Sequence, residues 1–194
     1  QFQGVALENA ATGTCMKKTV SNYILVCSAF AILIMLTFTL YSIHEYEANE
    51  FDELHEKLES SIKTFRLLLE HKGADFRIVD GTLLAGTYQI NGNFEVPDKV
   101  QEIFGVVATV FMGDTRVSTN VLDASGKRAL GTRLVGPAYD AVFRAGKGYR
   151  GEAPILGVNY LTAYDPIRDR TGTVIGVLFV GVKVSDFIAP LHVM

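Results

Sequence analysis

The feature that most constrains this chain is an uncharged, mostly apolar run over residues 19–43. It is longer than the ~20 residues that an α-helix needs to cross the hydrocarbon core of a bilayer. Lys17-Lys18 precedes the run, and acidic residues follow it from Glu45 onward. Because basic residues are retained on the cytoplasmic side of a membrane, everything from His44 onward is predicted to lie outside the cytoplasm.

A cleaved signal peptide is the main alternative for this segment. Its apolar core would be about 7–15 residues long and would end at a small-x-small cleavage site. The sequence Tyr41-Ser42-Ile43-His44 offers no such site, so residues 16–43 are predicted to form an uncleaved transmembrane signal anchor. Met16 resembles a natural start. Residues 1–15 show no periodicity, and they are interpreted as leader or vector-like sequence outside the fold.

Composition limits what the outer part of the chain can be. Residues 44–187 have the size of one compact domain, and the only cysteines, Cys15 and Cys27, precede it. A disulfide, a thiolate zinc site and c-type haem attachment are therefore excluded there. The net charge of −3 and the lack of a basic block argue against nucleic acid as a partner. Hydrolase, metalloprotease and P-loop motifs are absent from the sequence, so no enzyme activity, catalytic residue, metal or cofactor is predicted.

Residues 45–72 have the pattern of an amphipathic helix. Apolar side chains recur at spacings of three and four: Phe51, Leu54, Leu58, Ile62, Phe65 and Leu68. No Gly or Pro lies between Thr19 and Lys72, so the anchor is predicted to continue into this helix without a break and to end before Gly73. The helix is longer than a core contact requires. We therefore expect a homodimer through it, with Leu54, Leu58 and Phe65 on the seam.

The remaining sequence alternates short strands with turns. Asp80-Gly81 predicts a tight hairpin turn between strands over residues 76–79 and 82–90, and Gly113-Asp114 predicts a second hairpin. Short helices are expected over residues 97–104 and 135–145, the second with Val135 and Val142 among its inward residues. Further strands are expected over residues 149–156, 160–167 and 173–184. About seven strands with short connections predict an α+β domain, in which an antiparallel sheet carries helices on one face.

Five segments, taken in order, resemble a known family. They are residues 109–121 (TVFMGDTRVSTNV), 126–133 (GKRALGTR), 149–153 (YRGEA), 160–167 (YLTAYDPI) and 172–182 (GTVIGVLFVGV). Together with the long anchored helix, they resemble the single Cache domain, an extracytoplasmic PAS-like sensor domain of bacterial chemoreceptors and sensor kinases. The resemblance covers about residues 44–187. It implies a sheet whose concave face holds a small ligand, a dimer through the N-terminal helix, and a second membrane helix that residues 188–194 would approach.

The resemblance also implies site residues on two strands. Relatives that sense carboxylates carry an Arg and, three residues later, a His on the strand equivalent to residues 116–121. Arg116 corresponds to the first position, whereas Thr119 stands where the His would be. Thr162 stands where sensors of citrate and C4-dicarboxylates carry another Arg. This argues against a tricarboxylate and favours a smaller or less charged ligand.

The residues themselves are also consistent with a small-anion site. The guanidinium of Arg116 suits bidentate capture of a carboxylate. Strand alternation places Tyr160, Thr162 and Tyr164 on one face, where two aromatic walls and a hydroxyl would line a pocket. Arg133, at the expected entrance of a helix, is a further candidate for binding an anion.

Two functions therefore stay open at the level of sequence. The first is the sensing of a small organic anion, by a periplasmic or extracellular domain anchored in the bacterial inner membrane. The second is a membrane-tethered PAS-like module that dimerises or docks a partner without a ligand. In the second case Arg116 would pair with Asp114 or contact solvent, and Tyr160 and Tyr164 would be core residues. A cavity lined by these side chains would favour the first function, and a filled core the second.

Overall fold

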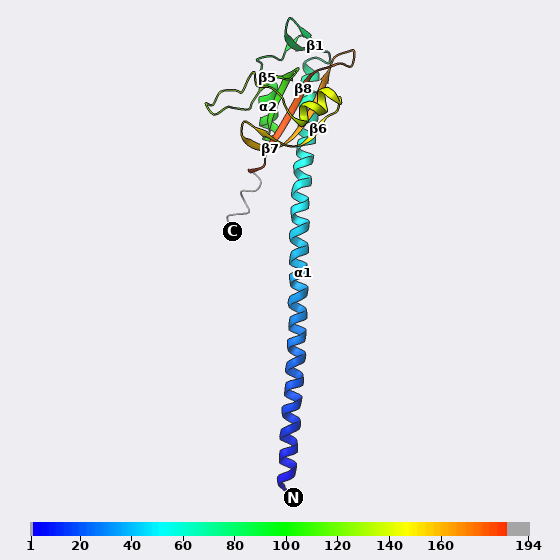
Figure 1. Cartoon of the computed structure of the whole chain (residues 1–194), viewed down its shortest axis with the longest axis vertical. Helices are drawn as coiled ribbons and strands as arrows, with labels where there is room; N and C mark the ends of the chain where they lie inside the picture. Colours follow the sequence, from blue (N-terminus) through cyan, green and yellow to red (C-terminus); the bar gives the residue numbers. More distant parts are fainter. Residues whose placement is uncertain (1, 186–194) are drawn as a thin grey trace. The chain divides into compact units, whose positions relative to one another are not determined.

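The computed structural model describes residues 2–185, with side chains described for residue 23 and for residues 25–42 and 53–185. Helix α1 runs without a break over Phe2–Lys72, as predicted from residue 19 onward. The chain divides into two compact units, Gln1–Asp52 and Glu53–Met194 (Figure 1). The first unit contains a candidate membrane span, Leu25–Ser42, whose apolar side chains are exposed. The expected approach to a second membrane helix, residues 188–194, lies outside the described residues.

Helix α1 ends at a close contact with the first β-hairpin. The backbone N–H of Gly73 donates to the carbonyl of Leu69 over 3.2 Å, which closes the last turn. A Cβ atom at position 73 would collide with the backbone carbonyl of Ala85. Glycine is therefore required here because the backbone of the hairpin passes so close, in addition to its role at the helix end.

A small three-stranded antiparallel sheet follows, formed by β1 (Phe76–Val79), β2 (Thr82–Ala85) and β3 (Tyr88–Gln89). The predicted turn is present: Asp80 and Gly81 both have positive φ, 49° and 74°, as a two-residue hairpin of type I′ requires. The single strand expected over residues 82–90 is broken at Gly86, which has a φ of 60°.

The second, five-stranded sheet has the order β5-β4-β8-β7-β6, and every neighbouring pair is antiparallel. Its strands are β4 (Val107–Met112), β5 (Thr115–Thr119), β6 (Tyr149–Ile155), β7 (Val158–Arg168) and β8 (Val174–Lys183). Residues 2–185 thus contain eight strands, where about seven were predicted. Strands β5 and β6 form the two edges of this sheet.

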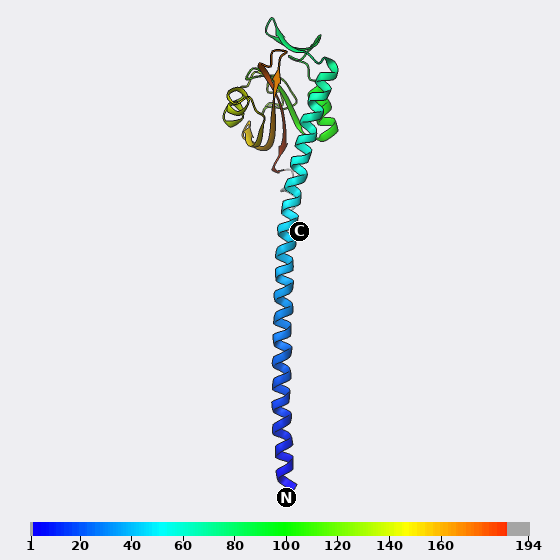
Figure 2. The same cartoon turned by 90° about the vertical axis from the view of Figure 1, so that its right-hand side faces the viewer.

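Helices cover both faces of the five-stranded sheet (Figure 2). The C-terminal part of α1 and helix α2 (Glu95–Phe104) pack on one face, where Ile62, Phe65 and Val100 are fully buried. The short helix α3 (Pro137–Tyr139) and the π-helical turn η1 (Asp140–Arg144) pack on the other face. The prediction of helices on one face only is therefore wrong.

The helix expected over residues 135–145 begins later than predicted. Pro137 opens it, and the backbone widens into a π-helix after Tyr139. Val142 is fully buried as expected, but the side chain of Val135 lies before the helix and is 75% exposed. Its expected inward orientation is wrong because position 135 does not share the helical phase of position 142.

Within the second unit, α1 is attached to the sheet by apolar and by charged contacts. Leu58 and Phe65 are buried in the core of their own chain, and Leu54 packs against the same core. These residues therefore do not form the predicted dimer seam. At the sheet, Arg150 forms ion pairs with Glu59 of α1 and, over 2.9 Å, with Asp165 of β7. The guanidinium of a second α1 side chain, Arg66, also donates to the carbonyl of Pro166 over 3.1 Å.

Candidate functional site

A cavity of about 290 Å³ lies on the face of the five-stranded sheet that α3 and η1 cover. Its walls come from β4, β5, β6, β7 and the segment over residues 132–138. Most of the lining side chains are apolar, and the polar ones are Arg116, Thr132, Arg133, Tyr149, Glu152 and Tyr164. The volume is at the lower end of the ~300–1,000 Å³ range of ligand pockets, so the cavity suits a small ligand.

The segment over residues 131–134 forms one wall because it pairs with the edge strand β5. The N–H of Gly131 donates to the carbonyl of Arg116, and the N–H of Arg116 donates to the carbonyl of Thr132, each over 2.9 Å. The N–H of Leu134 donates to the carbonyl of Asp114 over 2.8 Å. These bonds cover the free edge of the sheet and enclose the side chain of Arg116.

Arg116 carries a buried positive charge at this cavity. The residue is 5% exposed, and among the described residues its Nε and Nη1 atoms have no hydrogen-bond partner. The guanidinium carbon lies 5.3 Å from the ring centroid of Phe111, close enough for a cation–π contact. Burial lowers the pKa of Arg116 below its ordinary value, because desolvation disfavours the charged form.

Tyr164 forms the floor of the cavity next to Arg116. Its ring packs against Tyr149 and Phe179, with centroids 5.9 and 4.8 Å away. Burial raises the pKa of Tyr164 to about 12, although the charge of Arg116 acts in the opposite direction. The phenol therefore stays protonated at neutral pH and can donate a hydrogen bond to an anion.

Arg133 lies on the rim of the same cavity. Its side chain is 72% exposed, and its Nη1 atom lies 3.2 Å from Oδ2 of Asp114. Arg116, Arg133 and Tyr164 thus line the same cavity. Asp114 pairs with Arg133 and leaves Arg116 unpaired, which is the reverse of the pairing expected for a merely structural Arg116.

The other three predicted site residues lie on the same face but are absent from the described lining of the cavity. The hydroxyl of Thr119 is 2.6 Å from that of Thr109, and the hydroxyl of Thr162 donates to the carbonyl of Gly151 over 2.6 Å. Tyr160 is buried nearer the N-terminal end of β7, away from Tyr164. Four residues of a strand span about 13 Å, so Tyr160 and Tyr164 can share a face without sharing a pocket.

Sequence reasoning missed Phe111 and Tyr149 as cavity residues. Phe111 pairs with Arg116 in the β4–β5 register, two positions before the turn at Gly113. Counting outward from that turn could have identified it. Tyr149 lies on the same face of β6 as Gly151 and Ala153, and these small residues leave room beside its aromatic ring. The wall over residues 134–138 has no comparable signal, because its position depends on tertiary contacts.

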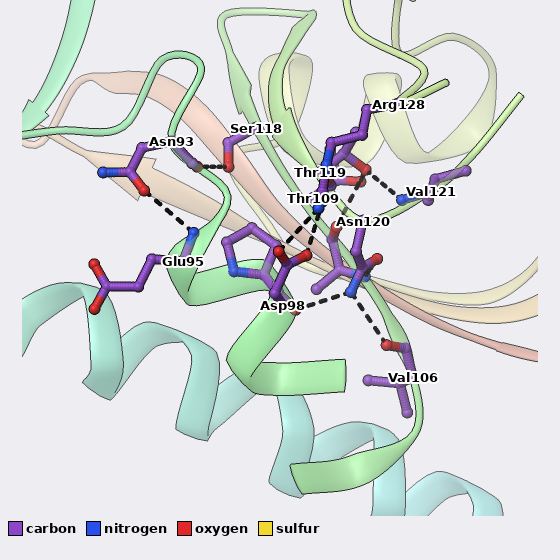
Figure 3. A network of polar contacts seen from close by, with 12 residues as sticks. Asn93, Glu95, Asp98, Val106, Thr109, Ser118, Thr119, Asn120, Val121 and Arg128 are labelled. Carbon is purple, nitrogen blue, oxygen red and sulfur yellow. Dashed lines mark hydrogen bonds and ion pairs between the residues drawn. The ribbon is translucent and has the colours of Figure 1, made fainter. Parts of the chain in front are cut away.

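A polar network joins β5 and the loop after it to helix α2 (Figure 3). The buried amide of Asn120 donates to the carbonyl of Pro97 over 2.8 Å and accepts the N–H of Ala108 over 2.7 Å. Arg128 forms two bonds with Asp98, over 2.7 and 2.9 Å, and a third with the carbonyl of Thr119. The network thus ties the C-terminal end of β5, the strand that carries Arg116, to α2.

Two acidic side chains outside the cavity close surface turns. One carboxylate oxygen of Asp123 accepts bonds from Ser125 and Lys127, and one of Asp169 does the same for Thr171 and Thr173. These bonds hold the pKa values of both carboxyls below their ordinary range. Within the residues whose side chains are described, no group of three His, Cys, Asp or Glu side chains is placed to hold a metal ion.

An antiparallel five-stranded sheet, with long helices on one face and a small cavity on the other, is the architecture of a PAS-like sensing domain. The chain belongs to the single Cache domain 3 family, whose family model matches residues 88–193, more than half of the chain. This confirms the resemblance noted in the sequence and the α+β fold, and it identifies an extracytoplasmic sensing domain of the kind that serves as a signalling input.

Comparison with solved structures gives the sensor domain of E. coli DcuS as a similar fold. The two chains are 19% identical, with a TM-score of 0.38, and the similarity covers 50% of this chain and 71% of the DcuS chain. None of the curated proteins matches the chain.

Proposed function

We propose that this chain is the input domain of a bacterial transmembrane receptor of the chemoreceptor type, which senses a small organic anion. The ligand, a carboxylate, binds in the cavity beside Arg116, and the membrane helices transmit the binding event. The observation that carries this proposal is the buried guanidinium of Arg116, which faces a cavity without a counter-ion among the described residues.

The energetic argument rests on the cost of burying a charge. An ionised side chain that leaves water needs a partner, because the desolvation cost of several kcal/mol is otherwise uncompensated. A carboxylate in the cavity would compensate the charge of Arg116, and hydrogen bonds to the buried Nε and Nη1 atoms would require a local movement of the side chain. Tyr164 would add a neutral donor beside them.

The alternative function, a tethered interaction module without a ligand, is less well supported. It predicts that the sheet face beside Arg116 is filled by core side chains. Instead this face has a cavity of about 290 Å³, and the adjacent Asp114 pairs with Arg133. Both observations favour a binding site over a structural salt bridge.

A thermal-shift screen of the purified full chain against organic acids and amino acids tests the proposal. A ligand that binds only the folded state raises the melting temperature by mass action. The variant Arg116→Ala should lose most of that rise, with affinity reduced about ten- to hundredfold, because a charge-assisted hydrogen bond is worth about 1.5–3 kcal/mol. Arg170→Ala is the matched control, since Arg170 is exposed and pairs with Asp75 away from the cavity. Equal affinity in the Arg116 variant would move the anion elsewhere, first to Arg133.

For the cellular location, we propose an inner-membrane anchor with the Cache domain outside the cytoplasm. The candidate span Leu25–Ser42 and the preceding Lys17-Lys18 support this orientation. A reporter enzyme that functions only after export from the cytoplasm should be active when it is fused after Ile43. Cytoplasmic activity of the reporter, or release of a shorter soluble form, would contradict the anchor.

We also retain the homodimer through α1 as a proposal, with a different seam. Because Leu58 and Phe65 face the core of their own chain, a second copy could contact only the opposite side of the helix. Leu67 is on that side and is 63% exposed. A second copy of α1 would pack against this side, with Leu67 at the centre of the contact.

A further inference from the structure

The charged groups at the cavity admit only one carboxylate. Arg116 is the cavity-lining cation without an ion pair among the described side chains. Arg133 also lines the cavity, but its charge is compensated by Asp114 at 3.2 Å. A second carboxylate on the ligand would therefore find no further uncompensated positive side chain among the described lining residues.

The rest of the lining is suited to an apolar body. Beyond the charged groups and the hydroxyls of Thr132, Tyr149 and Tyr164, the walls are mostly aliphatic side chains and prolines, among them Leu134, Pro137, Pro154 and Ile155. Such walls favour methylene and methyl groups by removing their surface from water. They offer no donor or acceptor to a second polar end of a ligand, which would lose its hydration without compensation.

We infer that the ligand is a monocarboxylate with a short apolar body, and that the Asp114–Arg133 ion pair sets this specificity by neutralising the second cation. This inference rests on the proposed function, because it assigns the ligand class of the same cavity. Asp114 would act through Arg133, without touching the ligand.

The test compares three four-carbon probes on the full chain in a nonionic detergent at neutral pH. Butyrate has one carboxylate and an apolar body, succinate has two carboxylates, and 2-aminobutyrate adds an ammonium group. Isothermal titration calorimetry should show butyrate binding at least about tenfold more tightly than either of the others, which corresponds to ~1.4 kcal/mol.

The variant Asp114→Asn tests whether the Asp114–Arg133 ion pair sets the ligand specificity. It removes the charge that compensates Arg133 and keeps the shape of the side chain. The ratio of succinate to butyrate affinity should rise about fivefold or more, because Arg133 becomes free for a second carboxylate. In the double variant Asp114→Asn/Arg133→Gln, this gain should disappear.

The possible outcomes separate the two proposals. If no organic anion binds the wild-type chain, the proposed function fails, and this inference fails with it. If succinate or 2-aminobutyrate binds at least as tightly as butyrate, and Arg116→Ala abolishes that binding, the proposed function holds and the inference is overturned. An unchanged affinity ratio in a folded Asp114→Asn variant would overturn the role of Asp114. If that variant does not fold, the wild-type ratios still decide the ligand class.

Discussion

Arg116 and Phe111 face each other across the β4–β5 hairpin, with the guanidinium carbon 5.3 Å from the ring centroid. The two residues are register partners, so the hairpin itself fixes their distance. The ring contacts one side of the guanidinium, while Nε and Nη1 lack hydrogen-bond partners in the described structure. Arg116 is therefore packed against an apolar neighbour, and none of the described side chains compensates its charge.

The first prediction concerns the stability of the unliganded domain. Replacing Arg116 by Met should raise the free energy of unfolding by about 1 kcal/mol or more, because an apolar side chain of similar length removes an unpaired buried charge. Urea unfolding in a buffer without organic acids measures this. Arg133→Met is the control, and a change within ~0.5 kcal/mol is expected for that exposed position. A clear loss of stability in Arg116→Met would show that the charge has a structural partner.

The second prediction concerns the network of Figure 3. Asn120→Ala leaves the N–H of Ala108 and the carbonyl of Pro97 without their partner, so the free energy of unfolding should fall by about 2–3 kcal/mol. The midpoint of urea unfolding should fall while its slope stays constant. Asn159→Ala, on the exposed part of β7, should have little effect. Equal effects of the two substitutions would contradict the assigned role of Asn120.

The third prediction concerns pH. The hydrogen bond from Arg150 is the main reason that the pKa of Glu59 is held below its ordinary value. A carboxyl with a lowered folded-state pKa stabilises the protein above its unfolded-state pKa, and this contribution is lost as pH falls through the folded value. The stability difference between the wild type and Glu59→Gln should therefore be present above about pH 5 and should shrink towards about pH 3.

The expected difference is about 0.2–1 kcal/mol at neutral pH, since both side chains remain partly exposed. Chemical unfolding across the pH range measures it. Glu56→Gln, on an exposed position of the same helix, is the control and should show no such pH-dependent loss. A constant difference between the wild type and Glu59→Gln from pH 7 to about pH 3 would argue against the ion pair.

The fourth prediction concerns self-association. If α1 pairs with a second copy through its exposed side, Leu67→Asp should weaken the dimer by about tenfold or more, or ~1.4 kcal/mol, as measured by sedimentation of residues 44–187. Leu130→Asp is the control, because Leu130 is also exposed but lies outside α1. Leu58→Asp should unfold the domain, since position 58 is buried in its core. A monomeric wild type at high concentration would refute the dimer.

Local chemistry explains which parts of the fold could be predicted from the sequence. The turn at Asp80-Gly81 was predictable because few other residue pairs adopt two consecutive positive φ values. The unbroken α1 was predictable because no helix breaker interrupts it. Arg116 was named as a site residue from the resemblance and from the suitability of a guanidinium for a carboxylate, and its role in binding stays a prediction. The turn and the helix depend on residues that are close together in the sequence.

The parts that the sequence did not predict depend on contacts between distant segments. Alternation predicted the face of Tyr160 and Thr162, but the position of the cavity along β7 is set by the segment over residues 132–138. The apolar stripe of α1 was expected at a dimer seam, because periodicity shows that a face is buried without showing which surface covers it. Here the five-stranded sheet of the same chain covers Leu58 and Phe65.

The attachment of α1 to the sheet has a mechanical consequence. A slide of α1 by one residue along its axis would move its side chains by about 1.5 Å. That movement would displace Leu58 and Phe65 from a closely packed core, and it would break the contacts of Glu59 with Arg150 and of Arg66 with Pro166. Within the second unit, α1 and the five-stranded sheet are therefore expected to move as one body, so that a ligand-driven displacement of α1 would carry the sheet with it.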